Sequence, residues 1–413
     1  MTLNESIHYH KNKLYVDSVS VTEIVQSVGT PVYIYSLRRA LNNLERIKTA
    51  FTALDTHIHY SAKANANLTI LRTLIEDGVG VDAVSGGEIF RALKAGVAPQ
   101  NIVFAGVGKS ESEIQFALEK GVGWFNVENV RELDFINYYA EDMGLSGIKI
   151  ALRLNPDVTA NTHPYIATGH GGAKFGLTAT VIANVLKQQS QWINLDFRGL
   201  HIHIGSQLGD TLATQQAIQK ALDLLAPYPN MKTLNIGGGM PAQYDSQAQL
   251  PSFEMFAHDI MPMLRDYTVL LEPGRSIIAD AGILVGQVLY TKNQAAQHIA
   301  ITDASMTELI RPALYQAKHE IVPVAENHSK TQVTQVVGPV CETADVLGRD
   351  IPLATLNEGD LVVALTAGAY GAVMSSNYNA RPKPAEVVVA ANGESWHVAR
   401  RRETWEDLVA KEI

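Results

Sequence analysis

Short apolar runs alternate with amphipathic segments through the middle of the chain. Eight such runs occur, at residues 57–60, 79–84, 102–105, 124–127, 148–154, 199–204, 233–236 and 268–271. They are nearly continuous in Val, Ile, Leu and Ala, which is typical of parallel strands covered on both faces. The segments between them place apolar residues at helical spacing. Eight strand–helix units in succession predict an α/β fold with a (β/α)8, TIM-like barrel. An open doubly wound sheet is the alternative, because strand order cannot be read from a sequence.

Capping signals indicate where three of the helices begin. In a capping box, a first side chain accepts a free backbone N–H and a Glu three positions later reaches back to the cap. This pattern occurs at Ser85-x-x-Glu88, Ser110-x-x-Glu113 and Asn129-x-x-Glu132. Gly96 and Gly121 stand where the first two of these helices should end.

The pattern changes after residue 286. Short alternating runs recur at residues 298–302, 320–324, 331–337, 360–365 and 385–389, without convincing helices between them. They predict an antiparallel β domain, which the strand-like first thirty residues could join. We therefore predict a barrel domain at residues 31–285 and a β domain formed by residues 1–30 and 286–413. Helices are expected at residues 37–54, after Ser36 as N-cap, and at 405–411.

Composition narrows the classes of function. A chain of 413 residues is long enough for two domains. Its formal net charge of −9 argues against nucleic acid or an anionic membrane as the main partner. The most apolar window, residues 277–290, contains Asp280 and is too short to span a bilayer. The single cysteine, Cys341, excludes an intrachain disulfide, so we expect a cytoplasmic protein.

If the barrel prediction is right, chemistry belongs at the carboxyl ends of its strands. Lys63 follows the first apolar run, among small residues that suit an amine forming a reversible covalent bond, although most lysines are solvated surface charges. Asp82 ends the second run. The sixth carries His201 and His203 and leads to Ser206, and Glu272 ends the eighth.

Two glycine turns follow the seventh and eighth runs. Gly237-Gly238-Gly239 and Gly274 would let backbone N–H groups approach an anion, and this end of a barrel is a common phosphate site. A tight turn is the simpler explanation of three glycines. Likewise, Arg275 could simply pair with Glu272.

The two histidines of the sixth run project to the same face. They have no acidic or cysteine partner at metal-ligand spacing, so no metal site is expected. Stacking on a flat cofactor is the better functional interpretation for His203, whereas a hydrogen-bonded core histidine is equally plausible for His201. Further polar groups occur in the β domain, each of which could be structural: Arg311, Tyr315, Cys341, Glu342 and Tyr370.

Taken together, these residues resemble the fold-type III, pyridoxal-phosphate-dependent decarboxylases, and among them most closely those acting on diaminopimelate. The resemblance covers essentially the whole chain, with its motifs in the expected order. The motifs are Tyr60-Ser61-Ala62-Lys63-Ala64-Asn65, Ser85-Gly86-Gly87-Glu88, His201-Ile202-His203-Ile204-Gly205-Ser206-Gln207, Gly237-Gly238-Gly239, Glu272-Pro273-Gly274-Arg275, Arg311-Pro312-Ala313-Leu314-Tyr315, Cys341-Glu342 and Met374-Ser375-Ser376-Asn377-Tyr378-Asn379.

The resemblance implies a pyridoxal 5'-phosphate cofactor. Lys63 would hold it as an imine, His203 would stack on its ring, and Glu272 would keep its pyridine nitrogen protonated. A protonated ring is a strong electron sink, which favours decarboxylation over racemisation. The remaining implied cofactor-binding residues, several of them around the phosphate, are Asp82, Ser206, Gly238, Gly239, Gly274, Arg275 and Tyr370.

The resemblance also implies a substrate. Cys341 would return a proton to the carbon that loses carbon dioxide. Arginines aimed at a substrate suggest a second carboxylate, so the implied reaction converts meso-2,6-diaminopimelate to L-lysine and carbon dioxide. The implied substrate-binding residues are Arg275, Arg311, Tyr315, Glu342 and Tyr370. Family members are homodimers in which each active site is shared between two chains.

Two alternatives remain. One is decarboxylation of another amino acid, such as ornithine, arginine, or a polyamine or siderophore precursor. The other is a catalytically dead homologue acting as a binding protein, which is disfavoured because Lys63, Glu272 and Cys341 are all present. Departures from the family pattern, at Ser305, at Thr343-Ala344 and at residues 170–173, concern loop geometry and fine specificity.

Overall fold

The computed structural model describes residues 3–294, 297–327 and 329–413. The chain divides into two compact units. The barrel unit contains residues 45–241 and 249–275, and the β-rich unit contains residues 1–44, 242–248 and 276–413. The predicted domain boundary between residues 285 and 286 stays a prediction.

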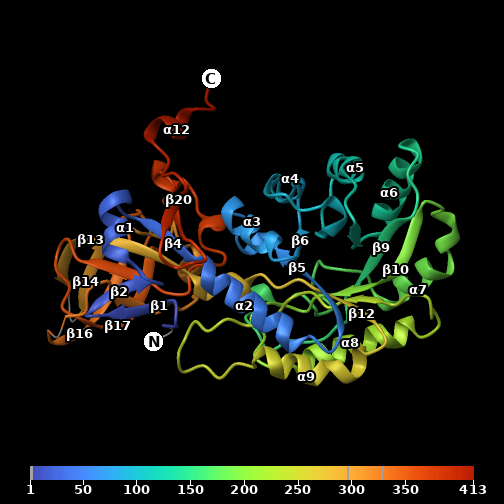
Figure 1. Ribbon diagram of the computed structural model, residues 1–413, viewed down its shortest axis with the longest axis horizontal. Coiled ribbons are helices and arrows are strands. Elements are labelled where there is room, and N and C mark those ends of the chain that lie inside the picture. Colours follow the sequence, from blue (N-terminus) through green and yellow to red (C-terminus); the bar gives the residue numbers. More distant parts are fainter. Residues whose placement is uncertain (1–2, 295–296, 328) are drawn as a thin grey trace. The chain divides into compact units, whose positions relative to one another are not determined.

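Eight parallel strands form a closed barrel in the barrel unit (Figure 1). Their order around the barrel is β10-β11-β12-β5-β6-β7-β8-β9, with β9 pairing β10 to close the ring. This confirms the predicted (β/α)8 barrel and excludes the open sheet. The strands are β5 (Asp55–Ser61), β6 (Gly80–Ala83), β7 (Ile102–Phe104), β8 (Trp124–Val127), β9 (Ile148–Leu154), β10 (Leu195–Ile202), β11 (Thr233–Asn235) and β12 (Thr268–Leu271).

A helix follows each barrel strand. They are α3 (Leu68–Glu76), α4 (Gly86–Ala95), α5 (Glu111–Lys120), α6 (Val130–Asp142), α7 (Ala179–Lys187), α8 (Leu212–Leu225), α9 (Phe253–Leu264) and α10 (Arg275–Ile278). Short 3₁₀ turns lie at η1 (Ala62–Ala64), η2 (Pro99–Asn101), η3 (Pro164–Ile166) and η4 (Gln189–Gln191). Gly96 and Gly121 end α4 and α5 in the left-handed conformation, as predicted.

Only one of the three expected capping boxes is complete. Ser110 and Glu113 bond reciprocally at the start of α5. Ser85 caps α4, but Glu88 accepts from the N–H of Val84, one residue before the cap. Glu132 likewise accepts from the N–H of Glu128 and from the Lys109 ammonium. The sequence pattern marks these helix starts correctly, but it does not fix which N–H each glutamate finds.

The β-rich unit has two sheets. One is β1-β2-β3, and the other has nine strands, with β17-β16-β14-β13-β4-β19-β20 in order and β15 and β18 joined beside β13. The strands are β1 (Ile7–His10), β2 (Lys13–Val16), β3 (Val19–Ser20), β4 (Val32–Ser36), β13 (Gly282–Gln294), β14 (Gln297–Thr302), β15 (Ile321–Pro323), β16 (Thr331–Val337), β17 (Val346–Ala354), β18 (Leu361–Ala364), β19 (Ala385–Val389) and β20 (Trp396–Arg400).

The pairing is mostly antiparallel, as predicted, but β14–β16 and β4–β19 are parallel. The N-terminal segment joins this unit, since β4 lies between β13 and β19. Sequence patterns missed β13, β17 and β20 and the helices α1 and α11. The remaining helices are α1 (Val21–Val28), α2 (Leu37–Ala50), α11 (Arg311–Tyr315) and α12 (Trp405–Val409), and the 3₁₀ turns are η5 (Ala279–Ala281), η6 (Ala372–Met374) and η7 (Tyr378–Ala380).

Apolar side chains from both ends of the chain build the core of the β-rich unit. Val32 and Ile34 of β4 pack with Val285 of β13 and Val387 of β19. All four are fully buried, which fits the pairing of β4 with both of the other strands. Within the described residues, no helix has the length and apolar character needed to cross a membrane.

A histidine is buried inside the barrel. His59 of β5 is paired with Gly80 of β6, where a Cβ would lie only 2.4 Å from the His59 ring. Burial, with a smaller contribution from His57, lowers the pKa of His59 to about 4 from its ordinary 6.5, although the Glu272 carboxylate opposes the shift. His59 is therefore neutral in the folded protein at neutral pH.

This burial predicts sensitivity to acid. The unfolded chain takes up a proton at His59 below pH 6.5, while the folded chain resists until about pH 4, so stability is lost as pH falls through this window. On going from pH 7.5 to 5, the free energy of unfolding should fall by about 2 kcal/mol more in the unchanged protein than in His59→Gln. Urea unfolding at both pH values measures it. His57→Gln, on the exposed part of the same strand, is the control and should retain most of the dependence, because burial is the larger cause of the shift and His57 a smaller one.

Candidate active site

The ends of β5 and β6 bring a lysine beside a buried aspartate. Ser61 and Asp82 are paired in the parallel register, and the Ser61 hydroxyl donates to Oδ2 of Asp82 at 2.6 Å. Lys63 follows on η1, and its Nζ lies 3.5 Å from the same oxygen. Burial and the Glu272 carboxylate raise the pKa of Asp82, while Lys63 and Ser61 oppose the rise. Lys63 thus stands where a reactive amine would meet a ligand at the rim of the barrel.

A second buried carboxylate is held by two amides. Oε1 of Glu272 accepts from Nδ2 of Asn126, at 3.0 Å, and from Nδ2 of Asn235, at 2.6 Å. Its Oε2 lies 3.4 Å from Nε2 of His201. Burial alone would raise the pKa of Glu272, but His201, Lys63 and Asn235 hold it below its usual range. Glu272 is therefore ionised, whereas the pKa of neighbouring Asp82 moves the opposite way. Such pairs separate acid and base roles.

His201, in β10, and His203, just after this strand, differ in their surroundings. His201 is buried and paired in register with Asn235, so both meet Glu272 from adjacent strands. His203 lies beyond the strand, partly buried, and its Nδ1 accepts the N–H of Gly238 at 3.3 Å. Burial and the positive charges of Lys63 and Arg153 lower the pKa of His203 well below its ordinary value. Its ring is consequently neutral and suited to stacking.

The glycine turns approach other backbone too closely for a side chain. A Cβ on Gly238 would lie 2.6 Å from the carbonyl oxygen of Glu272, and one on Gly274 would lie 2.9 Å from the Cβ atoms of Ser61 and Ala64. Gly239 has φ +98°, a conformation that favours glycine. Nearby, Nε of Arg275 donates to Oγ of Ser206 at 2.9 Å. Three loops, after β10, β11 and β12, thus supply hydrogen-bond donors.

These residues fit a phosphorylated pyridine aldehyde. The barrel offers an amine on Lys63, an ionised carboxylate on Glu272, a neutral ring on His203, and small backbone turns with Ser206 and Arg275 for a phosphate. Oδ1 of Asp82 is buried and makes no hydrogen bond among the described residues, so it retains capacity for one more polar partner. Within the described part of the chain, no group of three or more His, Cys, Asp or Glu side chains could hold a metal ion.

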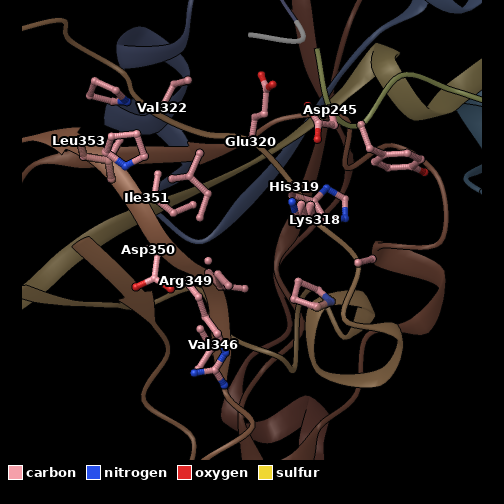
Figure 2. A pocket seen from close by; sticks show the side chains of 18 of the residues that line it. Asp245, Lys318, His319, Glu320, Val322, Val346, Arg349, Asp350, Ile351 and Leu353 are labelled. Carbon is pink, nitrogen blue, oxygen red and sulfur yellow. The ribbon is translucent and has the colours of Figure 1, made fainter. Parts of the chain in front are cut away.

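In the β-rich unit, Arg311 begins α11 and is buried. Its Nη1 lies 2.8 Å from Nε2 of His319, and its guanidinium lies 4.3 Å from the centre of the Tyr244 ring. Tyr244 and His319 line a cavity of about 1070 Å³ within this unit, together with Asp245, Lys318 and Glu320 (Figure 2). Tyr315, at the other end of α11, is partly buried.

The segment of the predicted Cys-Glu motif is exposed and braced by a second motif. The N–H of Cys341 donates to Oδ1 of Asn379 at 3.2 Å, and the Tyr378 hydroxyl donates to Oε1 of Glu342 at 2.6 Å. This hydrogen bond raises the pKa of Tyr378. The backbone of Tyr370 has a left-handed conformation, with φ +56°.

Sequence reasoning missed several residues of the barrel site. Asn126 and Asn235 fix Glu272, and Ser61 fixes Asp82, yet none was singled out. The available signal was a polar residue near the carboxyl end of an apolar strand in β8 and β11, the criterion that had identified Asp82. A simple Glu272–Arg275 pair was the alternative to a functional role, and the described contacts of these residues include the two asparagines and His201 for Glu272 and Ser206 for Arg275.

Comparisons with known proteins agree with this geometry. Residues 37–279 match the family model described as "Pyridoxal-dependent decarboxylase, pyridoxal binding domain". Proteins named diaminopimelate decarboxylase from Aquifex aeolicus and Neisseria meningitidis are each 40% identical, over 98% and 97% of this chain and 97% of their own length. The structure of diaminopimelate decarboxylase from Helicobacter pylori, complexed with L-lysine, superposes with a TM-score of 0.89 at 38% identity, covering 95% of this chain and 98% of that one.

The family model thus matches the barrel, and the relatives named diaminopimelate decarboxylase match nearly the whole chain. The chain belongs to the pyridoxal-phosphate-dependent decarboxylases, in their diaminopimelate decarboxylase family.

Proposed function

We propose that this protein is a carboxy-lyase that converts meso-2,6-diaminopimelate to L-lysine and carbon dioxide, the step that yields lysine in its biosynthesis, with pyridoxal 5'-phosphate as cofactor. The observation that carries the proposal is the buried, ionised Glu272, whose pKa the charge of nearby Lys63 helps to lower. The full-length relatives named for this reaction, one of them solved with L-lysine, support the choice of substrate.

When bound, pyridoxal phosphate supplies an electron sink for the pair of electrons left behind by carbon dioxide. Glu272 maintains that capacity. Its Oε1 is held by Asn126 and Asn235, and its Oε2 lies 3.4 Å from Nε2 of His201, so the carboxylate is fixed where it would pair with the pyridine nitrogen and favour its protonated form. A carboxylate of depressed pKa stabilises this positive charge without taking the proton itself.

Lys63 would hold the cofactor covalently and yield it to the amine of the substrate. Asp82 beside it, with Oδ2 3.5 Å from Nζ, would keep the Lys63 side chain at this position. His203 would pack on the ring of the cofactor, where its neutral state would avoid repulsion of a protonated pyridine. Ser206, Gly238, Gly239, Gly274 and Arg275 bind the phosphate, and Tyr370 completes the cofactor contacts.

The distal end of the substrate is an amino acid in its own right. Arg275 and Arg311 bind its carboxylate, with Tyr315 and Tyr370 alongside, and Glu342 pairs with its ammonium group. Cys341 gives a proton to the carbon that has lost carbon dioxide. Support for these roles comes from the matching motifs and from the bracing of Cys341 and Glu342 by Asn379 and Tyr378.

Two further parts of the proposal concern the state of the protein. It acts as a homodimer, with Cys341, Glu342 and Tyr370 of one chain serving the lysine of the other. It also works in the cytoplasm, where an exposed, unpaired Cys341 stays reduced.

A substrate panel tests the reaction. Carbon dioxide release should be compared for meso-diaminopimelate, L-lysine, L-ornithine and L-arginine. Only the first has a second carboxylate for two arginines, so its kcat/KM should exceed the others by roughly a hundredfold or more. A preference for one of the other three would reject the substrate assignment.

The anchor lysine is tested without reference to activity. Borohydride treatment of the purified protein should fix the cofactor on the peptide that contains Lys63, as read by mass spectrometry. Lys63→Ala should lose this attachment and roughly a thousandfold or more in kcat. Lys109→Ala, which removes another buried lysine of the barrel, should still be labelled on Lys63. Labelling that persists in Lys63→Ala would place the anchor elsewhere.

Shared active sites predict complementation. Lys63→Ala and Cys341→Ala chains should each be inactive. An equal mixture allowed to exchange subunits should recover up to about a quarter of the activity, because half of the dimers are then mixed and one of the two sites in each mixed dimer is intact. Light scattering and a tagged chain verify dimers and exchange. Proven exchange without recovery would contradict sites built from two chains.

A further inference from the structure

A buried histidine holds the arginine that we assign to the substrate's distal carboxylate. Arg311 and His319 are 6% and 3% exposed, and Nη1 of the arginine lies 2.8 Å from Nε2 of the histidine. The other ring nitrogen, Nδ1, lies 2.9 Å from the carbonyl oxygen of Leu365. His319 belongs to none of the motifs that carry the family resemblance.

Hydrogen-bond chemistry fixes the state of this ring. A guanidinium has only donors, and a carbonyl oxygen only accepts. Nε2 of His319 must therefore be the unprotonated acceptor, and Nδ1 must carry the hydrogen that goes to Leu365. An imidazolium would set a second positive charge and a second N–H against the guanidinium. The arrangement is consistent with one neutral tautomer alone.

The fold makes this contact by turning the chain back on itself. The helix α11 lasts five residues and ends at Gln316, which is left-handed, with φ +54° and its N–H bonded to the carbonyl oxygen of Arg311. The chain then reverses into β15. There β15 pairs with β18, and the N–H of Leu365 donates to the carbonyl oxygen of Glu320 at 2.9 Å. The strand register therefore fixes the carbonyl that orients His319.

An aromatic ring fixes the remaining freedom of the guanidinium. The Tyr244 ring lies 4.3 Å from the Arg311 guanidinium and meets His319 edge-on at 5.3 Å. Its loop is tied at two points beside the histidine and Leu365, since the N–H of Ser246 donates to Glu320 and the Thr366 hydroxyl donates to the carbonyl of Gln243. Figure 2 shows His319 and Glu320 on the wall of the cavity.

We infer that His319 is a positioning residue for substrate recognition: as a neutral acceptor, with Tyr244 as a wall, it sets the plane in which Arg311 presents its N–H groups to the distal carboxylate. The inference rests on the proposed function, which gives Arg311 that carboxylate. A bidentate pair requires the guanidinium to lie in the carboxylate plane, so a loosened Arg311 loses affinity for the carboxylate and not for the amine.

A pair of inhibitors isolates this carboxylate. L-Lysine, the product, keeps the distal carboxylate, and 1,5-diaminopentane is the same chain without it. In the holoenzyme, His319→Leu should raise the inhibition constant of L-lysine and the KM of diaminopimelate about tenfold. The constant for diaminopentane should change less than about twofold, and kcat should fall less than KM rises. His319→Gln, which restores an acceptor at the depth of Nε2, should recover most of the lysine affinity.

Controls separate the inference from the function on which it rests. His397→Leu removes an exposed histidine of the same unit and should change neither constant. Arg311→Leu should reduce the preference for lysine over diaminopentane at least about tenfold, with Arg275 still in place, and an unchanged preference would contradict the proposed role of Arg311. If Arg311→Leu reduces the preference and His319→Leu retains it in full, the positioning role alone is overturned. Equal loss of both ligands in His319→Leu would also overturn it.

The tautomer gives a test that is read on the unchanged protein. In the ¹⁵N-histidine-labelled holoenzyme at pH 8, the His319 signal, recognised by its absence in His319→Gln or in a segmentally labelled chain, should show a protonated Nδ1 and an unprotonated Nε2. A protonated Nε2 would exclude acceptance from Arg311 and reject the inference.

Discussion

An ionised carboxylate buried in the centre of a barrel is the costly feature on which the site depends. Taking a charged group out of water costs several kcal/mol unless partners offset it. Glu272 is offset by two amide donors on one oxygen and by His201 near the other, and each partner comes from a different strand. The closed barrel is what delivers these side chains to a common centre, and pairing His201 with Asn235 in register places two of them together.

The same constraint explains why Asp82 and Glu272 behave differently although both are buried. Asp82 has Ser61 and Lys63 as close partners, and its pKa is raised, whereas the pKa of Glu272 is lowered. Two negative charges in one dry interior compete, and the better-solvated carboxylate keeps its charge. The result is one buried carboxylate, Glu272, with a lowered pKa and one, Asp82 beside Lys63, with a raised pKa.

The β-rich unit uses a related arrangement for its polar side chains. Arg311 is held by His319 and Tyr244, and Glu342 by Tyr378, so side chains assigned to substrate recognition are fixed before any ligand arrives. Pre-organisation reduces the entropy lost on binding. His319, the partner of Arg311, lies just before β15, which pairs with β18. Tyr378, the partner of Glu342, lies next to the left-handed residue Asn379.

Apolar periodicity predicted the eight barrel strands, the mostly antiparallel β-rich unit and the strand ends at which Lys63, Asp82, His203 and Glu272 lie. Apolar periodicity is a local property, and parallel strands that are buried on both faces record it almost without interruption. Helix starts could also be predicted from local sequence, because a helix cap involves residues no more than four positions apart. The roles assigned to individual residues came from motif resemblance and stay predictions.

Contacts between side chains that are distant in the sequence became known from the three-dimensional fold. Asn126 and Asn235 lie 146 and 37 residues from Glu272, Tyr378 lies 36 residues from Glu342, and nothing local in the sequence announces either contact. The parallel pairings of β14 with β16 and of β4 with β19 could not be predicted either, because the apolar pattern of a strand does not indicate which strand pairs with it. Register and barrel closure set these distances, and they depend on the packing of the whole unit.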